Sequence, residues 1–473
     1  MRLEAVAAPA PVEVPFSAGD VARVMTLRGE RNGRAARDFY LYARAFWEQF
    51  TEISPVHRGR AITIFGVDER GQHRCVTTFV RPARAPRWLD SPRHAARFVS
   101  LLPFERRLGV GGRRLETWHS PHAFLARGRG DVEDHAILLC CLLQGFGLAA
   151  YVCTGTATEG DDSDNGGSGG GGGGGIGGDG GWVGRSRHHV WVATLTGAGA
   201  SQRVVFWESL TGQRYQLATP GARTPATAAS TKARRTAPGR AGPGQSSTGG
   251  ARSSGGSGGL AVRAVAAHHF RTVSAMFNGE SFLANKQDDD RISRTLFDLG
   301  DARLWKRMDP ARLAVLPADN AEVVLMPPTV DPVRCAEAVE MELRALVAAE
   351  RDDRLGLTTL WDDSLAALLQ PALAAYEAER VAGVSYGGEE FEDSVRRAVP
   401  EGFVFKGFPT CFSHPFPHRM FESLVRGPVS GDILKSSGDH TRFAVRARVF
   451  PYADRVLAVW VFFAVRYQPT HSL

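Results

Sequence analysis

Lysine, cysteine and long apolar runs are scarce in this sequence of 473 residues. The cysteines are scattered and form no C-x-x-C pair, which excludes a disulfide framework and favours a reducing, cytoplasmic compartment. The longest apolar run, residues 456–465, has about half the length of a membrane-spanning helix. The N-terminus has an early acidic residue and no continuous apolar segment, so we expect no secretory signal and no transmembrane segment.

The basic character of the chain does not indicate nucleic-acid binding. Lys and Arg together number 57, Asp and Glu number 50, and the formal net charge is +7. Nearly all of the basic residues are arginines, and they form no stripe interleaved with aromatic residues. A GC-rich coding bias accounts for this composition, so we expect no nucleic-acid partner.

Two low-complexity segments interrupt the otherwise dense sequence. One is a glycine tract that we place at 157–181, and the other, at 217–262, is rich in Ala, Thr, Pro, Ser and Gly. Neither has enough apolar side chains to offset the entropy lost on ordering, so both are predicted to be flexible. Because loop closure depends only weakly on loop length, we interpret them as surface insertions inside a domain.

Apolar periodicity in the first two thirds of the chain predicts a mixture of helices and strands. Aromatic residues at helical spacing predict a helix at 35–50, and a turn at 68–71 predicts a hairpin. The strands of that hairpin are expected at 61–65 and 75–80. Further elements follow along the chain: helices at 92–102 and 130–144, and strands at 148–156, 188–194 and 203–210.

The sequence changes character near residue 333, which indicates a second, smaller α+β domain. Two helices are predicted at 335–349 and 360–382. Residues 442–450 alternate between apolar and arginine side chains, which is typical of a strand with one buried face. Residues 456–465 are apolar on both faces and predict a central strand.

The residues that could carry chemistry lie between 130 and 212. A helix begins at Gly130-Asp131-Val132, and the strand motifs HHVWVAT and VVFWESL follow it. This order resembles the transglutaminase-like fold, an offshoot of the papain-type cysteine enzymes, in which a Cys begins a helix, a His lies on a later strand and an acid on the next. The resemblance places the nucleophile at Val132, the base at His189 and the orienting acid at Glu208.

The nucleophile position carries no reactive atom. In such a triad a helix N-terminus lowers the pKa of the thiol, and the His–acid pair takes up its proton. Val132 cannot ionise, so His189 and Glu208 can pair but have nothing to activate. The nearest cysteines fit the apolar pattern of their elements, and we interpret them as core residues; a relocated nucleophile among them is the alternative: Cys140, Cys141, Cys153.

The residues also do not predict a metal site or a cofactor. Asp131 is expected to be a helix N-cap, and with His135 it offers only two ligands at i and i+4. The doublets at 188–189 and 268–269 direct successive rings to opposite faces of a strand, so neither doublet is expected to chelate one ion. Glycine motifs in the insertion lack the strand–helix context of a nucleotide site. We predict no metal, no cofactor and no small-molecule ligand.

Longer blocks of sequence carry a closer resemblance. GDVEDHAILLCCLLQGFGLAAYVC (130–153), FWESLTGQRY (206–215) and the blocks at 354–380, 389–409 and 442–452 resemble the centrosomal protein of 76 kDa family. The resemblance implies a cytoplasmic protein of centrioles and basal bodies that restrains centriole duplication and associates with centriolar proteins, among them a capping protein. The family pattern reads G-D-C-E-D-H-A where this chain has valine, and the C2 domain that usually precedes this region is expected to be missing.

These observations lead to one organisation and two functional hypotheses. We expect an α+β protein with a flexible N-terminus, a transglutaminase-like domain holding both insertions, and a C-terminal α+β domain: 1–20, 21–330 and 331–473. The first hypothesis is a non-catalytic scaffold that limits centriole duplication by binding proteins in a degenerate cleft. The cleft candidates are Asp131, His189, Trp191 and Glu208. The alternative is a cysteine-type amidase or transglutaminase-like peptidase of the ciliary or centriolar compartment.

Overall fold

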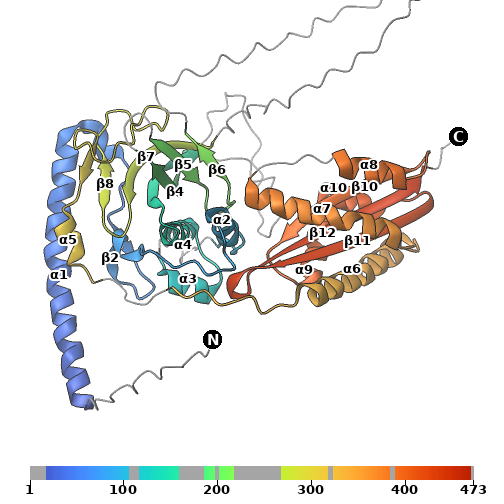
Figure 1. Ribbon diagram of the computed structural model, residues 1–473, viewed down its shortest axis with the longest axis horizontal. Helices are drawn as coiled ribbons and strands as arrows, with labels where there is room; N and C mark the ends of the chain where they lie inside the picture. The colour runs from blue at the N-terminus through green and yellow to red at the C-terminus, as the bar shows by residue number, and fades with distance from the viewer. Residues whose placement is uncertain are drawn as a thin grey trace, which may run out of the picture.

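The fold is of the α+β class, as predicted, and is built on two antiparallel sheets and a small hairpin. The computed structural model describes residues 17–105, 117–158, 186–197, 202–217, 268–317, 323–383 and 389–469. One sheet has seven strands and the other has three. Figure 1 shows them next to each other, with helix α1 (Ala18–Ile53) on the side of the larger sheet that faces away from the smaller one.

Helix α1 is longer than the sequence predicts. Aromatic spacing predicts a helix at 35–50, whereas the helix begins at Ala18, and the hydroxyl of the N-cap Ser17 accepts a hydrogen bond from the Asp20 N–H at 3.1 Å. Of the N-terminal segment predicted to be flexible, 1–20, the structure describes residues 17–20, which form the cap and the first turn of α1. The first half of α1 is largely exposed, so no apolar stripe marks it, and only the second half packs through Phe39, Phe46 and Phe50.

The predicted hairpin is present, but its strands are shorter and shifted. β1 (Phe65–Val67) pairs with β2 (His73–Cys75), in place of the predicted 61–65 and 75–80. The Asp68 carboxylate accepts hydrogen bonds from backbone N–H groups within the turn. Residues Val76–Phe79 form a 3-10 turn, where the Thr78 hydroxyl donates to the Cys75 carbonyl at 2.7 Å and competes with continued strand pairing.

The seven-stranded sheet has the order β6-β5-β4-β3-β7-β8-β9. Its strands are β3 (Ala149–Thr158), β4 (Ser186–Thr196), β5 (Arg203–Trp207), β6 (Arg214–Gln216), β7 (Phe270–Phe277), β8 (Phe282–Asn285) and β9 (Trp305–Arg307). The helices of this part besides α1 are α2 (Pro92–Ser100), α3 (Pro121–Arg127), α4 (Val132–Gly145) and α5 (Pro310–Ala314). Residues 92–100, 132–145, 149–158 and 186–196 confirm the corresponding predicted elements to within a few residues.

Alternate residues of the central strands pack into two separate apolar clusters. Val190 and Val192 of β4 share a cluster with the apolar residues of α4, whereas Trp191 shares one with Phe206 and Phe270. Helix α4 therefore covers one face of the sheet, and aromatic residues fill the other. This alternation is the period of two that a strand buried on both faces requires.

The predicted insertions lie mostly outside the described residues. β3 and β4 pair in register out to Thr158 and Ser186, so β3 continues two residues into the first segment. At the start of the second segment, the Leu217 N–H donates to the Val204 carbonyl at 2.9 Å. The rest of the two predicted insertions (159–181 and 218–262) and residues 1–16 fall outside the part of the chain that the structure describes.

The C-terminal part is a three-stranded sheet in the order β10-β12-β11 with helices on both faces. Its elements are α6 (Pro332–Leu355), α7 (Asp363–Ala382), α8 (Glu389–Ala398), β10 (Val404–Phe412), α9 (Pro417–Arg426), α10 (Pro428–Lys435), β11 (Asp439–Pro451) and β12 (Leu457–Gln468). Val461 and Phe463 of β12 pack in the cluster that contains α6, α9 and α10 residues, whereas Trp460 and Phe462 pack with α7. The predicted central strand is confirmed.

A buried ion pair joins the two parts. Arg97 of α2 donates to both carboxylate oxygens of Glu377 of α7, at 2.9 and 2.8 Å. Glu377 also accepts from the Tyr452 hydroxyl and the Trp460 indole N–H. The predicted boundary between residues 330 and 331 lies next to the N-cap of α6, Asp331, and stays a prediction. Among the helices in the described ranges, none has the length and apolar character needed to cross a membrane.

Candidate functional site

The N-terminus of α4 is closed by a capping box. The Asp131 carboxylate accepts from the Asp134 N–H, and the Asp134 carboxylate accepts from the Asp131 N–H, both at 3.2 Å. This confirms Asp131 as the N-cap. Val132 is the first helical residue, only 7% exposed, and belongs to the same apolar cluster as Val190. The nucleophile position is thus filled by a core side chain.

The cap lies in a buried acidic group. Asp131, Glu133 and Asp134 are all buried, and burial together with the charges of the other two raises the pKa of Asp131 to about 9. Asp134 also accepts from His119, whose Nδ1 lies 2.8 Å from the carboxylate. Arg127 donates to His119 Nε2 at 3.1 Å, which places the His119 hydrogen on Nδ1. The group therefore carries less negative charge at neutral pH than three ionised carboxylates would.

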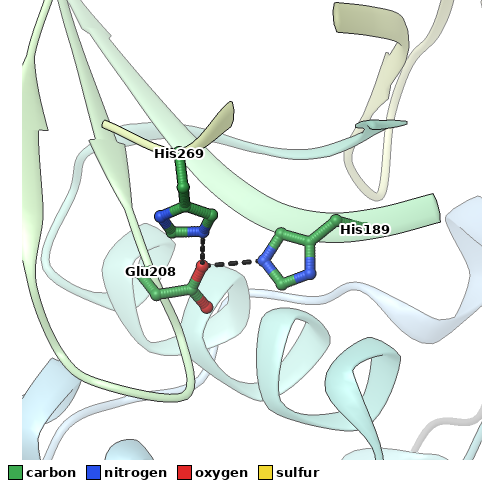
Figure 2. A group of neighbouring side chains, drawn as sticks. All are labelled: His189, Glu208 and His269. Carbon is green, nitrogen blue, oxygen red and sulfur yellow. Dashed lines mark hydrogen bonds and ion pairs between the residues drawn. The ribbon is translucent and has the colours of Figure 1, made fainter. Parts of the chain in front are cut away.

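Two histidine imidazoles contact the carboxylate of Glu208, the residue predicted to be the orienting acid. Figure 2 shows His189, from β4, and His269, just before β7, both pointing toward one carboxylate oxygen of Glu208, which follows β5. The Nε2 atom of His189 lies 2.7 Å from Glu208 Oε2, and that of His269 lies 2.9 Å from the same oxygen. The structure thus brings the predicted base and acid together and adds a second histidine.

The turn after β5 holds Glu208 in place. Its backbone N–H donates to the Gln213 carbonyl and its carbonyl accepts from Gly212, both at 2.8 Å, while its Oε1 accepts from the Leu210 N–H at 3.2 Å. Gly212 has a φ of +73°, a conformation that favours glycine. This turn ends β5 at Trp207, short of the predicted residue 210. Burial alone would raise the pKa of the Glu208 carboxyl, but His189 and His269 lower it to about 2.

Of the other predicted cleft residues, Trp191 packs directly against this pair. Trp191 is fully buried and lies beneath His189, where it stacks on Phe270 with ring centroids 4.7 Å apart. His189 stacks on the same two rings, at 6.2 and 5.9 Å, on the face of β4 opposite Val190. Asp131, His189, Trp191 and Glu208 are all buried, so a bound peptide would reach this group mainly through the part-exposed His269. Their role as cleft residues stays a prediction.

The cysteines near the predicted triad are buried thiols. Cys140 and Cys141 of α4 and Cys153 of β3 are fully buried in the apolar clusters. Burial raises the pKa of Cys141 to about 12 and the pKa values of Cys140 and Cys153 well above that of a free thiol. These thiols are therefore protonated at neutral pH and poor nucleophiles.

A cavity of about 980 Å³ lies elsewhere on this part of the molecule. Its walls come from the 3-10 turn at 76–79, the start of α3 and the segment around α5, with Arg81, Glu280 and Leu316 among the lining residues. None of the predicted site residues lines it. It is large enough for a peptide segment, but it contains none of the His–acid chemistry described above.

Sequence reasoning did not find His269 as a member of the site. Each histidine doublet by itself directs its two rings to opposite faces of a strand, so neither doublet indicates a shared site. The structure instead takes one ring from each doublet, His189 and His269, and joins them through Glu208. The available signal was that two doublets flank the same acid along the chain; their proximity depends on the β3–β7 pairing, which places β7 next to the β3–β4 pair.

Comparison with known proteins gives matches over nearly the whole chain. The family model described as the C-terminal domain of the centrosomal protein of 76 kDa matches residues 328–468. A second, described as the CEP76 peptidase-like domain, matches residues 116–165 and 246–308. Both domain families take their name from the same protein.

Similar curated proteins carry the same name. The centrosomal protein of 76 kDa of Xenopus laevis is 37% identical over 465 residues, and that of Homo sapiens is 37% identical over 466. The protein of that name from Danio rerio is also 37% identical, over 465 residues. Each alignment covers 97% of this chain and 61% of the relative, so the chain spans about 61% of the length of these relatives.

Proposed function

The chain belongs to the family of the centrosomal protein of 76 kDa, and on this basis we propose that it acts at the centrosome as a non-catalytic protein-binding scaffold. Its place would be the cytoplasmic centriole or basal body, and its role the limitation of centriole duplication. The names of the relatives support the centrosomal location. The partners would be centriolar proteins, among them a capping protein.

The observation that carries the non-catalytic part of the proposal is the identity of residue 132. The first turn of α4 is where a helix N-terminus would stabilise a thiolate, and Val132 offers only methyl groups there. The thiols on α4 and β3 are buried and protonated, which argues against a relocated nucleophile. A His–acid pair without a nucleophile can shape a site but cannot form a covalent intermediate.

Localisation of the tagged chain through one cell cycle tests the centrosomal role. Discrete signal that coincides with a centriole marker is expected. Diffuse cytosolic signal at every stage would contradict it. Because the chain spans part of the length of its relatives, the same tag on a full-length relative serves as the positive control.

Depletion and rescue test the non-catalytic role in centriole number. Cells depleted of the endogenous protein should over-duplicate centrioles, and expression of the chain should restore the normal count. Cys140→Ala and Cys153→Ala, each of which removes a candidate relocated nucleophile outside the predicted cleft, should restore it equally well. If the enzyme alternative holds, one of these variants fails to rescue although it is expressed at the level of the unmodified chain.

A thiol-directed covalent probe provides a second test against the enzyme alternative. In the native protein, no rapid labelling of Cys140, Cys141 or Cys153 is expected, since all three are buried. Cys335 is only partly buried and serves as an internal reference for labelling of an ordinary accessible thiol. Fast labelling of Cys140 or Cys153 that disappears in His189→Gln would revive the peptidase or amidase hypothesis.

A further inference from the structure

Three donor atoms suited to a transition metal converge at the end of the seven-stranded sheet. One ring nitrogen each of His189 and His269 and a carboxylate oxygen of Glu208 all lie within 4.8 Å of one another. They come from three separate segments, as Figure 2 shows, so the fold rather than local sequence brings them together. Imidazole nitrogen and carboxylate oxygen are ordinary ligands of Zn²⁺, and two histidines with one glutamate are a known ligand set for it.

The Glu208 carboxylate is positioned to use one oxygen. Oε1 is held by the Leu210 N–H at 3.2 Å, whereas Oε2 faces both imidazoles. The turn around Gly212 fixes the backbone of Glu208, and stacking on Trp191 and Phe270 fixes the ring of His189. Ligands that are already oriented lose little conformational entropy when an ion binds, which favours affinity.

The charge of Glu208 also favours a cation. Its side chain is only 3% exposed, and an anion buried in this way requires compensation. Among the described residues, its ion-pair partners are His189 and His269, at 2.7 and 2.9 Å, rather than an arginine or a lysine. Imidazoles can provide hydrogen bonds, or they can share a metal ion with the carboxylate.

The spacing needs only a small adjustment to bind an ion. With Zn–N and Zn–O bonds of about 2.0–2.1 Å, tetrahedral ligands lie roughly 3.3–3.4 Å apart. The present N···O separations of 2.7 and 2.9 Å would open by about half an ångström. His269 has 30% of its side chain exposed, so an ion can reach the site from solvent and a water molecule can complete the coordination.

From this convergence we propose that His189, His269 and Glu208 form a binding site for a divalent transition-metal ion, with Zn²⁺ as the expected metal. In the metal-free form each Nε2 carries the hydrogen that it donates to Glu208, because a carboxylate oxygen only accepts. On binding, each ring presents its Nε2 lone pair to the ion, and the hydrogen on Nε2 moves to Nδ1 or is released to solvent. No redox change accompanies this step.

Titration of the metal-free chain with Zn²⁺ tests the proposal. Isothermal calorimetry at neutral pH should give one equivalent bound, and His269→Ala should weaken binding at least tenfold. His268→Gln is the matched control, because His268 is the neighbouring residue and its Nδ1 contacts the Phe270 carbonyl instead of Glu208. Glu208→Gln, which keeps the shape of the side chain and loses the charge, should also weaken binding at least tenfold.

Substitution of Co²⁺ for Zn²⁺ identifies the ligands. A visible spectrum of nitrogen and oxygen ligands is expected, without a sulfur charge-transfer band. The proposal is overturned if the unmodified chain binds no Zn²⁺, if His269→Ala binds as tightly as His268→Gln, or if the cobalt spectrum shows thiolate ligands. Circular dichroism of each variant separates loss of the site from loss of the fold. Absence of metal binding would leave the centrosomal proposal intact, since localisation is measured separately.

Discussion

At the scale of single residues, Asp131 caps helix α4 and also lies in a buried group of acidic side chains, where a negative charge is costly. As an N-cap it only needs an oxygen that accepts from the Asp134 N–H. Buried beside Glu133 and Asp134, its carboxyl has a pKa raised to about 9. The folded protein therefore holds a proton here that the unfolded chain, with a pKa near 3.8, releases. Folding takes up a proton between these values, so stability should fall as pH rises through this range.

Asp131→Asn should keep the N-cap of α4 and remove the ionisable group. Asparagine is an equally good N-cap and binds no proton in this range. Between about pH 6 and about pH 8 the unmodified chain should lose at least ~1 kcal/mol of stability relative to the variant. Urea unfolding at both pH values measures this difference. Parallel pH profiles for the two proteins would mean that Asp131 is ionised in the folded state.

Residues of the candidate site were partly predictable from sequence. Family resemblance placed a base at His189 and an acid at Glu208, and the structure joins them by a hydrogen bond of 2.7 Å. His269 could not be placed in this way, because its contact with Glu208 spans 61 residues of sequence and depends on how β3 pairs with β7. Burial of Trp191 was also not visible, since an aromatic residue two positions after a histidine fits a cleft wall and a core equally well.

At the scale of elements, strand β12 has the clearest relation between sequence and structure. A run of apolar residues on both faces requires cover on both sides, and helices supply it. The first half of helix α1 is the opposite case, because it is largely exposed and has no apolar pattern. Only helix propensity and the Ser17 cap indicate a helix there. Elements that pack were predictable from periodicity, whereas exposed helix and short strands such as β1 and β2 were not.

Phe463→Ala should test the contribution of β12 to the core. Phe463 is fully buried and stacks on Phe443 of β11 with centroids 6.0 Å apart. Its truncation should cost about 3–5 kcal/mol, because it leaves a cavity between β12 and the α6 side of the sheet. Phe416→Ala is the matched control, since Phe416 is 54% exposed and its loss should change the denaturation midpoint little. Equal midpoints for the two variants would contradict the assignment of β12 as the central strand.

At the scale of the whole molecule, the contact between Arg97 and Glu377 couples the two sheets. Both side chains are buried, and Glu377 accepts from Arg97, Tyr452 and Trp460 together. No sequence pattern links residues 280 positions apart, so this contact could not have been predicted. A buried pair of this kind gives orientation, because each partner is costly to leave unpaired.

Arg97→Ala should destabilise the protein by about 3–5 kcal/mol by leaving Glu377 without its cation. Glu377→Ala should be at least as damaging, since it also leaves the Tyr452 hydroxyl and the Trp460 N–H without their acceptor. Arg44→Ala removes an exposed ion pair with Glu48 and should not shift the denaturation midpoint measurably. Chemical denaturation compares the three variants. If Arg97→Ala behaves like Arg44→Ala, the pair does not hold the two parts together.

The paired ends of β3 and β4 are a suitable site for inserting another protein domain. Thr158 and Ser186 are directly paired, so the chain leaves and re-enters the sheet at adjacent positions. The register of the two strands is set by their own pairing and does not depend on the segment that connects them. A reporter domain with neighbouring termini could replace the segment between them without altering a ladder bond. Fluorescent proteins inserted there would make an internal label for live imaging while both ends of the chain stay free.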